Sequence, residues 1–358
     1  PNVVLRINAS GEVCEWECES GSIIKREAES RGSVLEITCA FNGPKEHLYT
    51  ISPESVPGAI ESPTLQLISE VPLSGPFHYT MDEPNLGVLD MGYLEIENQE
   101  RSELLEILKI DQNIRTHFNI PQRAGKMVQP WFKKKFQDAP EVLGHVTIYF
   151  PFYVEEVPEN DLELCMETPG EFSVQVNGEQ VDLTDQGWWV DKAIRRFVLP
   201  ASMLKKGENI LVQEFDFRDD LDLEALYLLG DFAVRLEGNR KILTPLPEKI
   251  STGDLTAQGF PFYSGRILYH VSLLENYAAM GKVMLEVPHY SAACIKVNPD
   301  QPDAGFIAWQ PNTLDVTSAL ERSKKLTLEL VLTRRNAFGP LHHYPFNTIR
   351  NGPFCLSA

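Results

Sequence analysis

One run of the sequence recurs 121 positions further along the chain. The match needs no gap, and after it the two copies drift while keeping the same order of apolar strands and short turns. A recurrence of this kind restricts the chain to folds that contain the same structural unit twice. The matched pairs are Gly144 and Gly265, Leu164 and Leu285, Asn177 and Asn298, and Trp188 and Trp309.

Within each copy, short runs of alternating apolar and polar residues are bounded by Gly, Pro, Asn and Asp. Leu162, Leu164 and Met166 form one such run. Alternate side chains of a strand share a face, so each run predicts a strand that is apolar on one side. Two stacked sheets bury such faces, and the Asn-Gly at 177–178 is typical of a hairpin. Each copy therefore predicts a β-sandwich of roughly 100 residues.

At 358 residues the chain is too long for one ordinary sandwich. We predict an all-β protein: tandem sandwiches at 75–243 and 244–358, after a small β-rich segment at 1–74. Two prolines and no periodicity mark 243–252 as a linker. A short helix is expected within 101–118, where Leu104, Leu105 and Leu108 have helical spacing, with Ser102 as its N-cap.

The formal net charge is −19, from 51 acidic and 32 basic residues. Such a surface repels phosphate, so neither nucleic acid nor an anionic membrane is expected as a partner. A neutral ligand such as a sugar carries no such penalty. The acidity has a plainer alternative explanation, which is that it keeps a large protein soluble. No stretch approaches the roughly 20 apolar residues of a membrane helix.

The six cysteines form no C-x-x-C pair and no zinc-site spacing. Small apolar core residues are the expected role, although a disulfide among Cys14, Cys18 and Cys39 stays open. This usage favours a reducing, cytoplasmic compartment.

No catalytic or cofactor motif is present, and no cofactor or metal is expected. Glu224 and Asp231 are the best local candidates for a glycosidase carboxylate pair, with two surface acids as the alternative. His342 and His343 are adjacent, so on an extended chain they point in opposite directions and are poorly placed to share a metal.

The tryptophans are the candidate carbohydrate-binding residues. Trp188, Trp189 and Trp309 lie at matching places of the two copies, and Trp131 is a fourth candidate. An indole face can stack on the C–H surface of a sugar, or it can fill the end of a sandwich core. Trp188 and Trp189 are neighbours, so on a strand no more than one of them fills the core.

Several longer motifs carry a resemblance to a known class of protein. They are "MDEPNLGVLDMGYLEI" at 81–96, "QPW" at 129–131, "GWWVD" at 187–191, "LEALYLLGDFAV" at 223–234, "AGFIAWQPNTLDVT" at 304–317 and "RRNAFGPLHH" at 334–343. Together they resemble the C-terminal region of large bacterial glycoside hydrolases, with jelly-roll, galactose-binding-like domains similar to those of glycoside hydrolase family two.

The resemblance implies that the catalytic acid and nucleophile lie in an upstream barrel domain of the same polypeptide. None of the family's catalytic residues maps onto this chain. The expected function is therefore a non-catalytic accessory region that supports the catalytic domain and contacts carbohydrate. A purely structural or protein-contact module, and a complete enzyme with an unrecognised site, are the alternatives.

Overall fold

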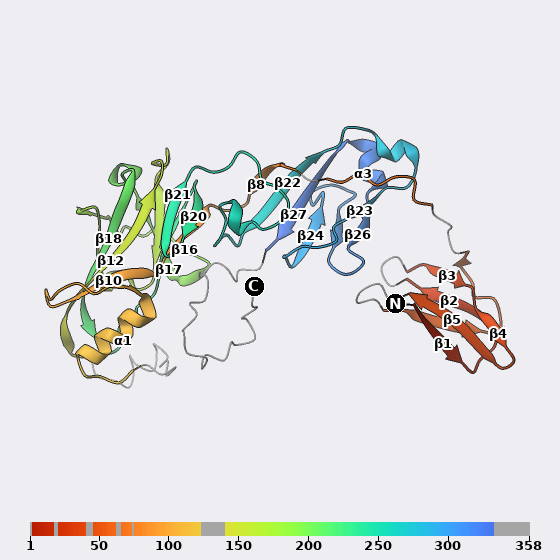
Figure 1. Cartoon of the computed structure of the whole chain (residues 1–358), viewed down its shortest axis with the longest axis horizontal. Coiled ribbons are helices and arrows are strands. Elements are labelled where there is room, and N and C mark those ends of the chain that lie inside the picture. The colour runs from red at the N-terminus through yellow and green to blue at the C-terminus, as the bar shows by residue number, and fades with distance from the viewer. Residues whose placement is uncertain are drawn as a thin grey trace. The chain divides into compact units, whose positions relative to one another are not determined.

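The computed structural model describes residues 2–17, 21–40, 46–61, 66–73, 75–122 and 140–332. Most of the regular structure in these ranges is β-strand, which confirms the all-β prediction (Figure 1). The chain divides into two compact units, Pro1–Ser74 with His270–Leu330, and Gly75–Tyr269 with Val331–Ala358. The sandwich boundaries expected from the sequence stay a prediction. In the described ranges, no helix has both the length and the apolar character needed to cross a membrane.

Two small antiparallel-rich sheets form the N-terminal segment. Leu35, Ile37 and Cys39 alternate inward from one strand and pack with Val13, so their spacing in the sequence correctly predicted one buried face. The first sheet has the order β1 (Asn2–Ile7), β5 (Val34–Ala40), β4 (Glu29–Arg31). The second has the order β6 (Leu48–Ser52), β2 (Glu12–Trp16), β3 (Ile23–Arg26), β7 (Ala59–Ile60).

The larger unit contains a two-sheet sandwich that holds the first copy of the repeat. Its larger sheet has the order β11 (Leu104–Glu106), β10 (Met91–Ile96), β12 (Val142–Val154), β18 (Gly207–Arg218), β14 (Ser173–Val176), β15 (Glu179–Gln180), with β21 (Arg240–Thr244) parallel to β12 and β20 (Ala233–Glu237) beside β21. Its smaller sheet has the order β16 (Trp188–Trp189), β17 (Asp191–Leu199), β13 (Leu162–Met166), β19 (Leu226–Gly230), β9 (Asn85–Leu89).

The inward faces of these two sheets fill one another. Ile148, Phe150 and Phe152 of β12 are fully buried in the same cluster as Leu164 of β13 and Phe197 of β17. Burial of each large apolar side chain contributes about 1.5–3 kcal/mol. The intervening residues of β12 face outward, so one strand supplies both a core row and a surface row.

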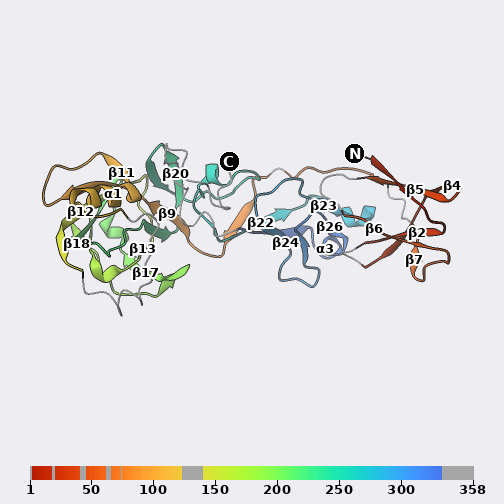
Figure 2. The ribbon, with the colours of Figure 1, turned by 90° about the horizontal axis from the view of Figure 1, so that it is seen from below.

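The single long helix of the described ranges begins later than expected. α1 spans Ile107–His117 and lies against β10 and β11 (Figures 1 and 2). Its N-cap is Glu106, whose carboxylate accepts from the N–H groups of Leu108 and Lys109. The prediction of Ser102 as N-cap was wrong. Leu104 and Leu105 satisfy helical spacing but pair with β10 as strand β11, and the Ser102 hydroxyl accepts from the Leu94 N–H instead.

The second copy repeats the strand order of the first. Its larger sheet has the order β25 (Gly305–Ile307), β24 (Cys294–Val297), β27 (Lys325–Val331), β22 (Arg266–Ser272), β8 (His78–Met81), and its two-stranded sheet pairs β23 (Met284–Glu286) with β26 (Thr313–Asp315). β14, β18 and β12 of the first copy thus correspond to β24, β27 and β22. A short helix, α3 (Thr317–Arg322), follows β26 where a 3₁₀ turn, Ala201–Met203, follows β17.

The same turn ends β14 in the first copy and β24 in the second. Asn177 and Asn298 have positive φ angles of 53° and 47°. The Asn177 N–H donates to the Ile210 carbonyl, and its side-chain oxygen accepts from the Ile210 N–H. Asn298 makes the same two bonds with Thr327. Ile210 and Thr327 are therefore equivalent positions of the repeat, and the structure confirms the duplication at the level of single hydrogen bonds.

The expected linker at 243–252 is packed. Ile250 is 1% exposed and exchanges two backbone hydrogen bonds with Phe77, of 2.7 and 2.9 Å. The Tyr79 hydroxyl donates to the Pro247 carbonyl at 2.9 Å. The two prolines predict a linker here, but Leu243 and Ile250 of this segment are buried within the larger unit.

Three of the described cysteines are buried free thiols: Cys14, Cys39 and Cys165; the fourth, Cys294, is partly exposed. Burial, with the nearby Glu163 carboxylate, raises the pKa of Cys165 to about 12. These thiols act as small core residues, as expected. Cys18 and Cys355 lie outside the described residues.

Candidate functional site

Trp188 and Trp189 form the edge strand β16 and point in opposite directions. Trp189 is 8% exposed and packs against Tyr227, whereas Trp188 is 51% exposed. Trp188 lies opposite Arg195 and Trp189 opposite Asp191, with a register shift between them and a positive φ of 60° at Val190. The bulged turn therefore holds one indole in the core and leaves the other at the surface.

Trp309 occupies the corresponding place in the second copy. It is 56% exposed and lies in a turn in which the Asn312 N–H donates to the Trp309 carbonyl at 2.9 Å. Asn312 also has a positive φ of 60°, and the chain then enters β26. β26 pairs with β23 as β17 pairs with β13. Both copies thus expose an indole just before the same strand of the repeat.

The predicted tryptophans belong to different parts of the chain. Trp188 and Trp189 share a strand, Trp309 belongs to the other compact unit, and Trp131 lies outside the described residues. Each exposed indole is thus a separate candidate contact.

A charged pair borders Trp188. The Arg195 guanidinium donates to the Asp185 carboxylate through Nε at 3.1 Å. That contact and the Gly187 N–H hold the pKa of Asp185 below its usual range. An exposed apolar ring beside ionised hydrogen-bonding groups offers a sugar both kinds of contact it needs.

The candidate carboxylate pair is not brought together. Glu224 precedes β19 and Asp231 follows it, so the strand separates them by roughly 20 Å at about 3.3 Å per residue. Asp231 accepts from Asn160 at 3.0 Å. Glycosidase carboxylates lie about 5–10 Å apart, so these two residues cannot act as such a pair.

Metal ligation finds no support in the described part of the chain, where no three His, Cys, Asp or Glu side chains lie together suitably for an ion. His342 and His343 lie outside that part. Burial, with Asp222 and Asp191 nearby, raises the pKa of Glu167 at the surface of the smaller sheet.

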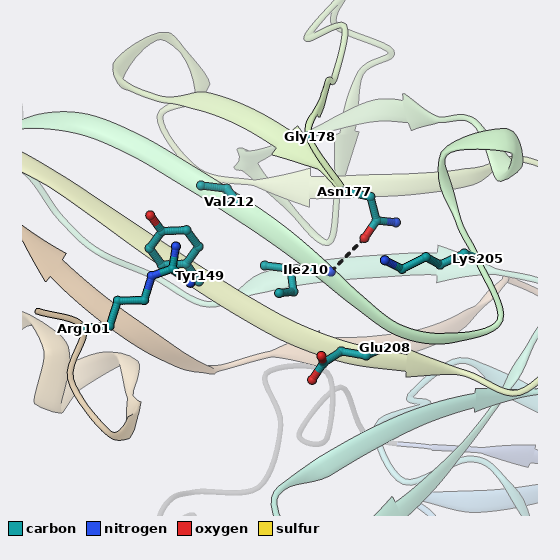
Figure 3. Close-up of a pocket in the computed structure, with 8 residues that line it drawn as sticks. All are labelled: Arg101, Tyr149, Asn177, Gly178, Lys205, Glu208, Ile210 and Val212. Atoms are coloured by element: carbon teal, nitrogen blue, oxygen red, sulfur yellow. Dashed lines mark hydrogen bonds between the residues drawn. The ribbon is translucent and has the colours of Figure 1, made fainter. Parts of the chain in front are cut away.

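A hollow of about 250 Å³ lies on the outer face of the larger sheet of the first copy (Figure 3). Ile210 and Val212, outward residues of β18, form its apolar floor, as the close-up shows. Its charged and aromatic lining consists of Arg101, Tyr149, Lys205 and Glu208.

Hydrogen bonds fix several of these lining groups. The Arg101 guanidinium lies 3.6 Å from the Tyr149 ring centroid and donates to Glu95 at 3.2 Å. The Tyr149 hydroxyl donates to the same carboxylate at 3.0 Å, and burial together with this bond raises the Tyr149 pKa. Glu208 accepts from the Tyr153 hydroxyl at 2.8 Å, which raises the pKa of Tyr153. The hollow therefore has an ordered rim before any ligand binds.

Only one row of the sequence indicates this hollow. Tyr149 and Tyr153 alternate with the core phenylalanines of β12, so two aromatic side chains on the outer face could have been expected. Arg101 and Lys205 come from loops about a hundred residues apart, and only the sheet brings them to one face.

No family model and no curated protein matches the chain. Solved structures with similar chains include a rhamnosidase from Novosphingobium sp. PP1Y (14% identity, TM-score 0.21, covering 62% of this chain and 21% of that one). A second is a β-D-glucuronidase of Dictyoglomus thermophilum (12% identity, TM-score 0.25, covering 71% of this chain and 39% of that one). A third is the Amycolatopsis orientalis exo-chitosanase CsxA (12% identity, TM-score 0.28, covering 69% of this chain and 28% of that one).

The fold and the surface features define an all-β protein with a duplicated, two-sheet unit and exposed aromatic side chains. The structures similar to it are glycoside hydrolase chains, of whose length this chain spans 21–39% in the three cases given. At TM-scores below 0.3 this likeness assigns neither an activity nor a substrate.

Proposed function

We propose that this chain is a non-catalytic accessory region of a glycoside hydrolase, which supports the catalytic domain and binds carbohydrate through Trp188 and Trp309. The observation that carries the proposal is the exposure of an indole at the same place in both copies of the repeat. A large aromatic ring that is half exposed to water can stack on the C–H surface of a sugar.

The interior of the sandwich favours a supporting role. The inward faces of its sheets are occupied by fully buried apolar side chains, and the one candidate carboxylate pair is separated by a whole strand. Among the described residues of this sandwich, the one candidate pair of acids lies at opposite ends of a strand, which is not the arrangement in which two carboxyls flank a sugar. The sequence resemblance supplies the partner, an upstream catalytic domain of the same polypeptide.

Titration calorimetry of the purified chain with a panel of neutral mono- and oligosaccharides tests the sugar-binding part. We expect saturable binding to at least one sugar and its loss in Trp188→Ala or Trp309→Ala. Val198→Ala is the matched control, because Val198 is an exposed apolar residue of β17, the neighbouring strand. No binding across the panel, or binding unaffected by both tryptophan changes, would overturn it.

The non-catalytic part has its own test. Aryl glycosides incubated with the chain should release no aglycone above the rate of a buffer blank. Turnover that disappears when one carboxylate is replaced by its amide would show that the chain is itself an enzyme.

A second function has one observation in its favour. Phe306 is 55% exposed and lies three residues before Trp309, so the second copy carries two exposed aromatic residues close together in sequence. Aromatic residues are enriched at protein–protein interfaces as well as at sugar sites. Under this alternative the tryptophans contact another protein domain, and no sugar of the panel binds.

A further inference from the structure

We propose that the hollow on the outer face of the first sandwich is a second carbohydrate subsite, selective for a sugar that carries a carboxylate. The inference deepens the proposed function, on which it rests for the choice of a sugar as ligand. The hollow lies on the larger sheet of the first copy, whereas Trp188 lies on the edge strand of the smaller sheet.

The floor and size of the hollow suit one sugar ring. Ile210 and Val212 are neighbouring outward residues of β18, and together they give an apolar strip in the middle of a polar sheet face. Sugar-binding sites pair such a strip with a few fixed polar groups around it. Here the polar groups stand at its sides, with Arg101 and Lys205 from loops and Glu208 from the start of β18 (Figure 3).

The charges around the hollow favour an anion. Two cations, Arg101 and Lys205, and one carboxylate, that of Glu208, line the hollow. This local excess of positive charge contrasts with the net charge of −19 for the whole chain.

Lys205 is the decisive cation. Arg101 is already bonded to Glu95, and Glu208 already accepts from Tyr153. Lys205 lines the hollow and makes no ion pair with any residue in the ranges that the structure describes. An ammonium group without a partner at the edge of an apolar strip is a ready contact for a carboxylate, and a charge-assisted hydrogen bond is roughly twice as strong as a neutral one.

The second copy has lost the floor of this subsite. Because Thr327 is equivalent to Ile210, Glu329 is equivalent to Val212. Glu329 is buried and paired with Lys296 at 3.0 Å, so an ion pair occupies the place of the apolar strip. We therefore expect one acidic-sugar subsite per chain, in the first copy.

The test compares methyl β-glucuronide with methyl β-glucoside as ligands of the full chain, by calorimetry at low and high salt. We expect the glucuronide to bind more tightly at low salt and to lose that advantage as salt rises. Lys205→Gln should weaken glucuronide binding about tenfold, in line with the loss of one charge-assisted contact, and leave glucoside binding unchanged. Lys206→Gln, an exposed neighbour that does not line the hollow, is the matched control.

Val212→Glu gives a second, independent variant, since it places the residue of the second copy on the floor of the first. It should abolish the glucuronide preference while Trp188→Ala leaves that preference intact. Equal binding of the two glycosides, or a preference that survives Lys205→Gln and Val212→Glu, overturns this inference. If neutral sugars still bind through Trp188 in that case, the proposed function stands; if no sugar binds at all, both fall.

Discussion

The indole of Trp189 lies against the phenol ring of Tyr227, with ring centroids 5.2 Å apart and the planes tilted by 50°. Tyr227 belongs to β19, which two strands, β17 and β13, separate from β16 in the smaller sheet. The contact therefore closes the edge of the sandwich over the core, and Trp188, the residue before it, is free to face the solvent.

Replacing Trp189 should destabilise the fold far more than replacing Trp188. Trp189→Ala removes a buried indole and leaves a cavity beside Tyr227, so we expect a loss of about 3–5 kcal/mol in the free energy of unfolding. Trp188→Ala removes a half-exposed ring and should cost under about 1 kcal/mol. Urea denaturation of both variants measures the difference, and equal losses would contradict the assignment of Trp189 to the core.

Asn177 combines a positive φ with three side-chain hydrogen bonds, to the Ile210 N–H, the Met203 carbonyl and Asn209. Asn177→Ala should lower the free energy of unfolding by about 2–4 kcal/mol, through lost bonds and backbone strain. Asn177→Gly loses the same bonds but accepts the left-handed backbone, so it should cost about 1 kcal/mol less than alanine. Chemical denaturation of the pair separates the two contributions, and an alanine variant as stable as the glycine variant would argue against strain at this turn.

Glu15 should make the N-terminal segment sensitive to acid. Burial alone would raise its pKa, but His47 and Arg26, each 2.6 Å from one of its oxygens, outweigh burial and hold the pKa below its usual value of 4.5. A carboxyl with a lowered folded-state pKa stabilises the fold above its unfolded pKa, and this stability is lost as pH falls through the folded value.

Glu15→Gln should therefore cost about 1–2 kcal/mol at pH 7, where the wild-type carboxylate is ionised. The difference should shrink below pH 4.5 as the wild-type group takes up its proton. Thermal unfolding of wild type and variant from pH 3 to 7 measures this difference in stability. Glu29→Gln, at an exposed ion pair with Arg31, is the control and should cost little at any pH. If the loss in the free energy of unfolding caused by Glu15→Gln stays constant with pH, the ionised carboxylate is not its cause.

The alternation of residues predicted most of the buried faces, because the period of a strand depends only on the backbone. Leu162, Leu164 and Met166 are all buried in one cluster as their spacing required. The same periodicity placed Trp188 and Trp189 on opposite sides, and the repeat placed Trp309 in the matching turn of the second copy.

The features that the sequence could not predict depend on distant partners. Leu104 and Leu105 fit a helix by spacing, and only the pairing of their strand with β10 decides against it. The hollow depends in the same way on Arg101 and Lys205, which share no local pattern. In the second copy the hollow is absent because Glu329 pairs with Lys296, and the alternation of apolar and polar residues does not predict that ion pair.

The packed segment between the two copies determines where the chain can be divided. A fragment that ends at residue 243 would leave the partners of Ile250 and Phe260 facing water, since both side chains are buried within the larger unit. Sandwiches prepared separately with that boundary would each expose an apolar patch and tend to aggregate. A fragment that holds the first copy should therefore extend past residue 243 and include Ile250 and Phe260.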